Sequence, residues 1–329
     1  MKKIFKLIEA LLILIALAVA ASHLLNFQTA PMIYGVSFNN EYAHYLGLDP
    51  HAVLEKILGD WKFKHVRLMA QWKDIEPKAG QFELGDLDWQ MDLAAARGAK
   101  VMLVIGQKTP RWPECHTPAW ANALSDQEYF DNFKRYLTLV VNRYKSHVAL
   151  ESWQIENEPF LPFGDHCRAI TPAQLQEEIA LTRQLDGAAH AVMVTDSGEL
   201  STWSRTAHAG DLFGTTMYRV VWNKYTGYWS YDWLPPLFYR AKLWFNKVDP
   251  KNAYVAELQA EPWIPDNNLF DTALAEQYKS MNVDRLKKNL DFAARTGMSR
   301  AYLWGAEWWY WLETKGETAV PDFVKTLNK

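Results

Sequence analysis

Residues 98–106 read Gly-Ala-Lys-Val-Met-Leu-Val-Ile-Gly, and this stretch sets a pattern that recurs along the chain. Gly98 follows a helical segment, at the place where a left-handed residue commonly ends a helix. The apolar run Val101–Gly106 comes next and does not alternate with polar residues, which is typical of a parallel strand buried on both faces. Gly187 and Gly297 take the same place before two later runs. The pattern predicts repeated helix-to-strand transitions.

Eight apolar runs of this kind follow residue 32, and each precedes a longer helical pattern. They are Ile33–Phe38, His65–Ala70, Val101–Gly106, Glu151–Glu156, Ala191–Thr195, Phe213–Tyr218, Ala253–Leu258 and Arg300–Gly305. Helix N-termini are indicated by Asp49-Pro50, by Thr171-Pro172, and by Ser125 with Glu128 three residues later. Strand and helix alternating eight times over roughly 280 residues predict a single-domain (β/α)8 TIM barrel. A doubly wound open sheet is the alternative, but the sequence lacks its Gly-rich first turn.

Composition agrees with one globular domain over residues 31–329, since no Pro-, Gly- or Ser-rich linker divides it. Hydrophobic residues make up 49% of the 329 residues and charged residues 22%, which excludes low-complexity disorder. The net charge is −3, and no basic run lies outside the N-terminus, so we expect no nucleic-acid partner. The content of 16 Trp, 15 Tyr and 15 Phe favours a carbohydrate ligand weakly, because flat aromatic faces suit both sugar rings and ordinary cores.

Residues 1–30 are expected to direct export and to lie outside the fold. Lys2, Lys3 and Lys6 precede an apolar run from Leu7 to Leu25. Two interpretations stay open. Ala18-Val19-Ala20 fits a signal-peptide cleavage site, which would give a secreted or periplasmic protein. Alternatively, the uncleaved run is just long enough to anchor the protein in a membrane, with the catalytic domain outside the cytoplasm.

Two glutamates at strand ends are the candidate catalytic residues. Glu158 follows the fourth run, and Glu257 lies near the end of the seventh. In a barrel of this kind the chemistry belongs at the carboxyl ends of the strands. Cleavage of a glycosidic bond needs one carboxylic acid for the leaving oxygen and one carboxylate at the anomeric carbon. Either residue alone could have a purely structural role in a salt bridge at the barrel rim, but the placement of both at strand ends favours catalysis.

The stretch Trp153-x-Ile155-x-Asn157-Glu158-Pro159 resembles the fourth-strand signature of clan A retaining glycoside hydrolases, which include cellulase-like and β-galactosidase-like barrels. The block Trp72–Pro77, with Gly80, Phe82 and Leu87-Asp88, is similar to the segment after the second strand in the same clan. The resemblance spans about residues 33 to 312. It implies a (β/α)8 barrel that hydrolyses a β-glycoside of an oligo- or polysaccharide without a cofactor or metal.

The resemblance also implies roles for individual residues. Glu158 would be the general acid/base, and Glu257 the nucleophile that forms a glycosyl-enzyme intermediate. Asn157 would hold the substrate 2-hydroxyl. Arg67 and Tyr218 would lie beside the nucleophile, and Trp304 would lie beneath the sugar. Arg67 and Tyr218 could instead be structural, as could Trp304.

Glu261 is a rival nucleophile four residues beyond Glu257. We prefer Glu257 because Val255-Ala256-Glu257 still has strand character, whereas Pro262 indicates a loop. Glu199 and Glu307 are lesser rivals.

Aromatic residues in the segments after strands three, six, seven and eight could stack on sugars at the mouth of the barrel. Trp112 and Trp263 are the candidates we assign to substrate binding. Others are Trp120, Trp222, Tyr225, Tyr228, Trp229, Trp233, Trp308 and Trp309. The segment from Trp233 to Phe245 is expected to form the sixth helix, with a membrane contact as the alternative.

The chain has two cysteines, Cys115 after the third strand and Cys167 after the fourth. These loops are neighbours in a barrel, and an exported domain meets an oxidising environment, so we expect a disulfide. Free thiols, or a zinc site with His116 and His166, remain alternatives.

The leading hypothesis is therefore an exported retaining β-glycoside hydrolase. A transglycosylase on the same scaffold and a non-catalytic sugar-binding barrel are the alternatives. The sequence does not indicate the sugar, endo or exo action, or the oligomeric state.

Overall fold

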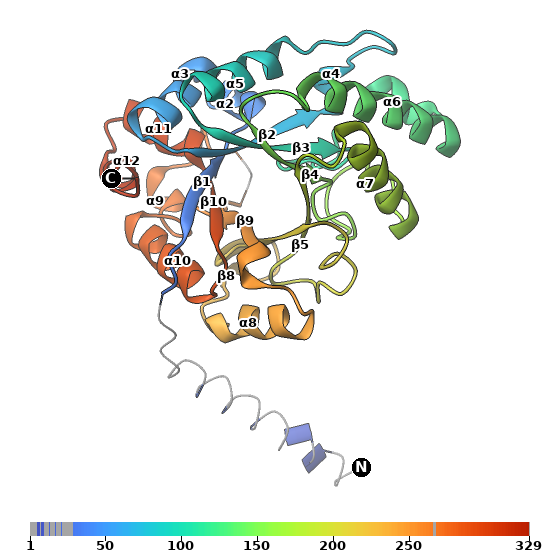
Figure 1. Ribbon diagram of the computed structural model, residues 1–329. Coiled ribbons are helices and arrows are strands. Elements are labelled where there is room, and N and C mark those ends of the chain that lie inside the picture. Colours follow the sequence, from blue (N-terminus) through green and yellow to red (C-terminus); the bar gives the residue numbers. More distant parts are fainter. Residues whose placement is uncertain are drawn as a thin grey trace.

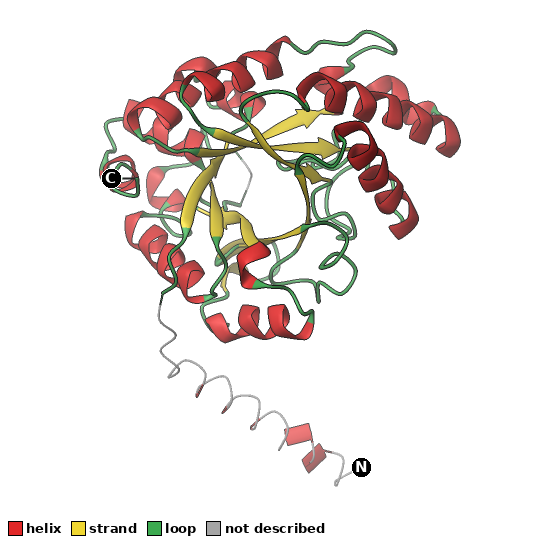
Figure 2. Ribbon diagram, in the orientation of Figure 1, coloured by secondary structure: helices red, strands yellow, loops and turns green. Residues whose placement is uncertain are grey.

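The computed structural model describes residues 29–265 and 268–328, together with residues 5, 6, 8, 9, 13, 17 and 21. Its centre is a closed barrel of eight parallel strands surrounded by helices (Figures 1 and 2). The barrel strands are β1 (Ile33–Ser37), β2 (His65–Gln71), β3 (Lys100–Gly106), β4 (Leu150–Ile155), β5 (Ala191–Asp196), β6 (Leu212–Met217), β9 (Ala253–Gln259) and β10 (Arg300–Trp304). The predicted (β/α)8 barrel is confirmed, because every predicted run coincides with one barrel strand to within two residues at either end.

The helices pack around the outside of the barrel (Figure 2). They are α2 (Asn40–Tyr45), α3 (Pro50–Glu55), α4 (Trp72–Ile75), α5 (Gly85–Ala96), α6 (Asp126–Tyr144), α7 (Pro172–Asp186), α8 (Pro236–Phe245), α9 (Leu274–Gln277), α10 (Val283–Arg295), α11 (Ala306–Thr314) and α12 (Ala319–Val324). Three short helical turns join them: η1 (Lys56–Asp60), η2 (Ala119–Ala123) and η3 (Pro250–Asn252). The sixth helix expected within Trp233–Phe245 is α8, whose Tyr239 and Leu243 are buried against the barrel.

The predicted capping residues act as expected. Asp49 accepts from the backbone N–H of His51 at 3.0 Å, and Ser125 and Glu128 form a reciprocal capping box. Thr171 caps α7 in the same way with Gln174. The three predicted helix-ending glycines, Gly98, Gly187 and Gly297, have φ values of 63°, 67° and 82°. Local sequence thus determines where these helices begin and end.

The connection after β5 departs from the prediction. Residues 197–211 form turns and no helix, so the expectation of a helix after every strand is wrong there. Buried Trp203 holds this segment by donating from its indole N–H to the carbonyl of Ser197 at 2.9 Å. At Gly198 the chain runs so close to β6 that a Cβ would lie 2.0 Å from the carbonyl oxygen of Thr216. Only glycine fits at position 198, and a turn segment that packs closely against β6 connects β5 to β6 instead of a helix.

A two-stranded antiparallel hairpin follows β6 and was not predicted. It consists of β7 (Val220–Asn223) and β8 (Gly227–Ser230). Its residues were expected only to form an aromatic loop at the mouth of the barrel.

The interior of the barrel is filled with side chains rather than open. Met102, Met193, Ala256 and Tyr302 form one buried cluster. Met69, Val104 and Trp304 form a second, with Tyr218 packed against it. Because Trp304 ends β10 and Tyr218 follows β6, the second cluster closes the barrel directly beneath the carboxyl ends of the strands.

Most of the predicted signal or anchor segment, residues 1–30, lies outside the described residues. Within the part of the chain that the structure describes, none of the helices has both the length and the apolar character required to cross a membrane. The chain joins the barrel where the backbone N–H of Ala30 donates to the carbonyl of Ala294 in α10 at 3.0 Å.

Candidate active site

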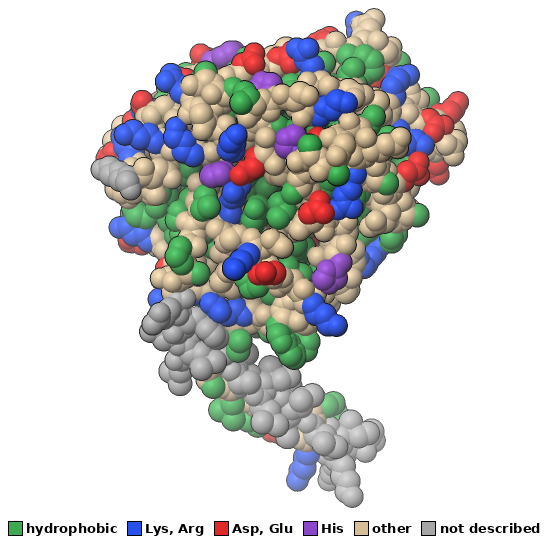
Figure 3. Space-filling view, in the orientation of Figure 1, with side chains coloured by type: hydrophobic (Ala, Val, Ile, Leu, Met, Phe, Trp, Pro, Cys, Tyr) green, Lys and Arg blue, Asp and Glu red, His purple; other side chains and the backbone are tan. Residues whose placement is uncertain are grey.

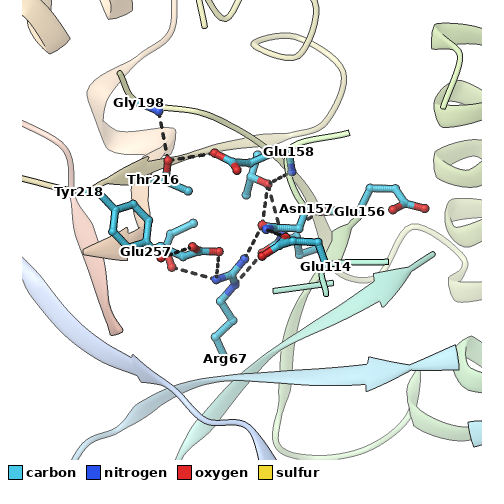
Figure 4. A network of polar contacts seen from close by, with 12 residues as sticks. Arg67, Glu114, Glu156, Asn157, Glu158, Gly198, Thr216, Tyr218 and Glu257 are labelled. Atoms are coloured by element: carbon cyan, nitrogen blue, oxygen red, sulfur yellow. Dashed lines mark hydrogen bonds and ion pairs between the residues drawn. The ribbon is translucent and has the colours of Figure 1, made fainter. Parts of the chain in front are cut away.

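A cavity of about 430 Å³ opens at the carboxyl ends of the barrel strands. Six of the predicted site residues line it: Glu158, Glu257, Tyr218, Trp304, Trp112 and Trp263. The other two, Arg67 and Asn157, are buried and bonded to the residues that line it (Figure 4). The structure thus brings all eight predicted residues to one site.

Glu257 lies within β9 and receives hydrogen bonds on both carboxyl oxygens. Arg67 donates to Oε1 at 3.0 Å, and the Tyr218 hydroxyl donates to Oε2 at 2.8 Å. Its side chain is only 6% exposed, so the two donors replace the water that a carboxylate would otherwise bind. The arrangement fixes the orientation of the carboxyl group in the cavity.

Arg67 connects the strands beneath the cavity. It is the third residue of β2, and its side chain lies buried in the barrel interior. The guanidinium donates to Gln154 at 2.8 Å, to the carbonyl of Ala256 at 3.1 Å and to Asn157 at 3.0 Å, in addition to Glu257. A fully buried guanidinium needs this number of acceptors, and its hydrogen bonds connect β2 to β4 and β9 across the barrel interior.

Glu158 has a different environment. It follows β4 with a φ of 45°, in the left-handed region that a non-glycine residue seldom occupies. Its Oε1 accepts from the Thr216 hydroxyl at 2.9 Å, and its backbone N–H donates to Thr195 at 3.0 Å. Burial, and secondly the negative charge of Glu257, raise the pKa of Glu158 well above its usual value. Glu158 therefore keeps its proton where an exposed glutamate would lose it.

The two glutamates project into the same space from different sides (Figure 4). The strand order around the barrel is β1-β10-β9-β6-β5-β4-β3-β2. Glu158 after β4 and Glu257 on β9 are thus three positions apart around the ring. Their strands therefore do not face each other directly; β10, which carries Trp304, stands opposite β4.

Sequence reasoning missed several charged residues of the site, among them Glu114 and Lys108. Glu114 accepts from the side-chain amide of Asn157 at 3.2 Å, and burial followed by the charge of Glu257 raises the pKa of Glu114 to about 7. Lys108 donates to the carbonyl of Glu158 at 3.1 Å and to that of Leu161 at 3.0 Å, which holds the loop carrying Glu158. Both residues follow the third strand, and Glu114 precedes Cys115; these are the sequence features that could have identified them as site residues.

Glu156 precedes the site by two residues but points away from it (Figure 4). It accepts from the backbone N–H groups of Gln107 and Lys108 at 2.9 and 2.7 Å. It also shares a hydrogen bond with Glu178 of α7, and burial raises the pKa of both, that of Glu156 to about 7. Glu156 and Glu178 are a buried acid pair outside the barrel wall.

The rival glutamates have other partners. Glu261 lines the cavity but is paired with Arg111, at 2.5 and 3.4 Å from its two oxygens. Glu307 accepts from the backbone N–H of Asn39 at 2.6 Å, and burial raises its pKa to about 7. Glu199 also lines the cavity, where the Tyr239 hydroxyl donates to it at 2.6 Å.

Of the ten aromatic residues expected at the mouth of the barrel, two line the cavity and two are buried in the core. Trp112 and Trp263 line the cavity, as predicted, and Trp263 packs edge-on against Tyr218 with 5.3 Å between ring centroids. Trp308 and Trp309 are fully buried in the core, so the expectation that they line the mouth is wrong. They lie in α11, where the indole N–H groups donate to Gln277 and to the carbonyl of Ala260.

Cys115 and Cys167 form the predicted disulfide, with their Cα atoms 5.2 Å apart. The bond joins the loop after β3 to the loop after β4 at the rim of the cavity. This excludes free thiols and a zinc site at these two residues.

Comparison with known proteins agrees with the site. The sequence profile of glycosyl hydrolase family 10 matches residues 67–177, a stretch that begins at Arg67 and contains Glu158 but ends before Glu257. This confirms the resemblance to clan A glycoside hydrolases. The chain is identified as a glycosidase.

Solved structures of glycosidases share the fold. A psychrophilic family 10 endo-β-1,4-xylanase has a TM-score of 0.53 at 18% identity, covering 83% of this chain and 86% of its own. Xylanase 10B from Thermotoga petrophila RKU-1, solved with xylobiose, has a TM-score of 0.54 at 16% identity, covering 83% and 82%. The exo-β-1,4-mannosidase Op5Man5 from Opitutaceae bacterium strain TAV5 has a TM-score of 0.53 at 17% identity, covering 84% and 51%. At these identities the similarity concerns the fold alone.

Proposed function

We propose that the protein is a retaining β-glycoside hydrolase in which Glu257 is the nucleophile and Glu158 the general acid/base. The observation that carries the proposal is the contrast between two glutamates in one cavity. Glu257 receives a charged donor and a hydroxyl donor on its two oxygens, whereas burial and the charge of Glu257 raise the pKa of Glu158. Two carboxyl groups in such opposite environments are suited to the roles of carboxylate and acid.

The reaction follows from these positions. Glu257 attacks the anomeric carbon while Glu158 gives its proton to the departing glycosidic oxygen, and a covalent glycosyl ester forms. Glu158, now ionised, then takes a proton from water, which attacks the same carbon and releases Glu257. One amide hydrogen of Asn157 is committed to Glu114, and the other remains for the 2-hydroxyl of the sugar.

Glu261 is less suited to nucleophilic attack because the negative charge that acts most strongly on the proton donor Glu158 is that of Glu257, not that of Glu261. The carboxylate that attacks the anomeric carbon has to lie beside the acid that protonates the leaving oxygen. Glu257 keeps Arg67 and Tyr218 as partners, and both can remain hydrogen-bonded to the ester oxygens or to the carboxylate as it leaves.

The disulfide and the enzyme class indicate a protein that works outside the cytoplasm. We further propose that residues 1–30 direct this export, either as a cleaved signal or as a membrane anchor. Mass determination of the N-terminus of the mature protein distinguishes these two fates.

The test is covalent labelling with 2-deoxy-2-fluoroglycosides that carry a good leaving group, applied as a panel of gluco, galacto, manno and xylo sugars. We expect one label per chain, on Glu257 itself as located by fragmentation of its peptide, and the same labelled residue in Glu261→Gln. Label on Glu261, or none with any sugar of the panel while the chain still binds oligosaccharides, would refute the assignment in favour of a rival nucleophile or a sugar-binding barrel.

A further inference from the structure

Arg111 occupies the wall of the cavity that lies across from the proton donor. It belongs to the loop after β3, and its guanidinium lies over the ring of Trp304, 4.2 Å from the centroid. Trp304 ends β10, the strand opposite β4 in the closed barrel, and Glu158 follows β4. Arg111 and Glu158 therefore bound the cavity at opposite ends.

Further aromatic rings and carboxylates surround the guanidinium. It lies 3.5 Å from the ring centroid of Tyr42, and Tyr45 stacks on Tyr42 with 5.7 Å between ring centroids. Glu261 holds its edge at 2.5 Å, and Glu307 lies 3.9 Å away. A cation that contacts two aromatic rings and is paired with a buried carboxylate resists displacement, because its departure would leave the carboxylate buried without a counter-charge.

The backbone at Arg111 is fixed as well. Its carbonyl accepts from the N–H of Glu114 at 2.8 Å and lies 3.0 Å from Nε2 of His116. The disulfide of Cys115 with Cys167 ties the same loop to the loop after β4. Arg111 is thus part of a built wall and not a mobile side chain that happens to cross the cavity.

The direction of the substrate follows from the proton transfer. Glu158 must reach the glycosidic oxygen, so the leaving group lies on the β4 side of the cavity. A sugar that extends from that oxygen toward β10 would bring its far end, with the terminal hydroxyls, to Arg111 and Glu261, which line the cavity there. A further sugar on those hydroxyls would have to occupy the volume of the Arg111–Trp304 stack.

We propose that Arg111 limits the glycone to one sugar residue and makes the enzyme exo-acting, releasing single residues from the non-reducing end. The inference rests on the proposed function of Glu158 and Glu257. The Arg111 guanidinium can donate hydrogen bonds to the free hydroxyls of a terminal sugar, and the Glu261 carboxylate beside it can accept them. The same side chains sterically exclude a chain that continues with another sugar. The fold itself does not decide this, since the similar structures include an endo-xylanase and an exo-mannosidase.

The experiment compares glycones of one and two residues on the same leaving group. The probes are 4-nitrophenyl β-D-glucoside, galactoside, mannoside and xyloside, and the matching β-1,3- and β-1,4-linked disaccharides. Initial 4-nitrophenol release gives kcat/KM for each. For the wild-type chain we expect the best monosaccharide glycone to exceed its disaccharides by roughly 10-fold or more, the lower end of what one pocket contact contributes to discrimination.

Arg111→Ala should lower this preference by roughly the same factor. If Arg111→Ala does not fold because the Glu261 carboxylate is left without a counter-charge, the double variant Arg111→Gln/Glu261→Gln replaces it in the test, since both charges are then removed. Arg168→Ala is the matched control, because Arg168 also stacks on a tyrosine, Tyr129, at 4.2 Å and pairs with a carboxylate, but lies outside the cavity. It should keep the wild-type preference.

The outcomes separate the two proposals. Turnover of disaccharide glycones at a rate within 10-fold of the best monosaccharide, or an unchanged preference in folded Arg111 variants, overturns exo action and leaves the hydrolase intact. Absence of turnover on every probe, with no fluoroglycoside label, overturns the proposed function and the present inference with it.

Discussion

Thr216→Val should extend activity to higher pH. The Thr216 hydroxyl donates to Oε1 of Glu158 at 2.9 Å, and this hydrogen bond stabilises the ionised form of that carboxyl. Valine keeps the shape of threonine and removes the donor. The pKa of Glu158, already raised by burial and by the charge of Glu257, should therefore rise further.

The size of the shift follows from the lost bond. A hydrogen bond of this kind contributes about 1 kcal/mol in favour of the ionised form, which corresponds to roughly 0.7 pH unit. Because Glu158 must be protonated to act as the acid, kcat/KM falls as pH rises through its pKa. The basic limb of the profile should thus move up by roughly 0.7 unit.

The assay is kcat/KM against pH on the best aryl glycoside, for wild type, Thr216→Val and Thr216→Ser. Serine keeps the hydroxyl and should leave the limb in place. Valine also removes the acceptor of the Gly198 backbone N–H, at 3.2 Å, so thermal unfolding should show a loss of stability of about 1–3 kcal/mol. A basic limb that stays or moves down in folded Thr216→Val would show that another group supplies the proton.

Three further predictions concern the same cavity. Glu257→Ala should abolish turnover, and azide should restore it as a glycosyl azide of inverted configuration, whereas Glu158→Ala with azide should give the retained anomer; nuclear magnetic resonance of the products decides. Glu114→Gln should move the basic limb down, opposite to the threonine variant, because the charge of Glu114 raises the pKa of Glu158; an upward shift would contradict this electrostatic assignment. Replacing Cys115 and Cys167 by serine opens a bridge across 52 residues and should cost about 4 kcal/mol of unfolding free energy in denaturant titrations, which a loss below about 1 kcal/mol would refute.

The barrel was predictable because its signals are local. The runs such as Val101–Gly106 are continuous and apolar, and Gly98 and Ser125 mark helix boundaries through their own conformational and hydrogen-bonding preferences. The turn segment after β5 was not predictable, since its path depends on the contact of Gly198 with the backbone of Thr216 on the next strand. Such a contact has no signature in the sequence of the segment itself.

The site residues, too, divide into those with a local sequence signal and those whose role depends on long-range contacts. Glu158 and Glu257 could be found from their places at strand ends. Arg111 could not, because its position depends on Tyr42 in α2, Glu261 after β9 and Trp304 at the end of β10, which meet only in the folded barrel. Long-range assembly, and not composition, gives such a residue its role.

The buried acid pair of Glu156 and Glu178 links folding to proton uptake. Both carboxyls have raised pKa values in the folded chain and ordinary ones when unfolded, so the native state holds a proton that the unfolded state gives up above its own pKa. Stability from this pair is fully present below about pH 4.5, the usual value for glutamate, and declines as the pH rises toward 7 and beyond. Unfolding at neutral pH therefore acidifies the surrounding medium, and a mildly acidic habitat would favour the native protein by mass action alone.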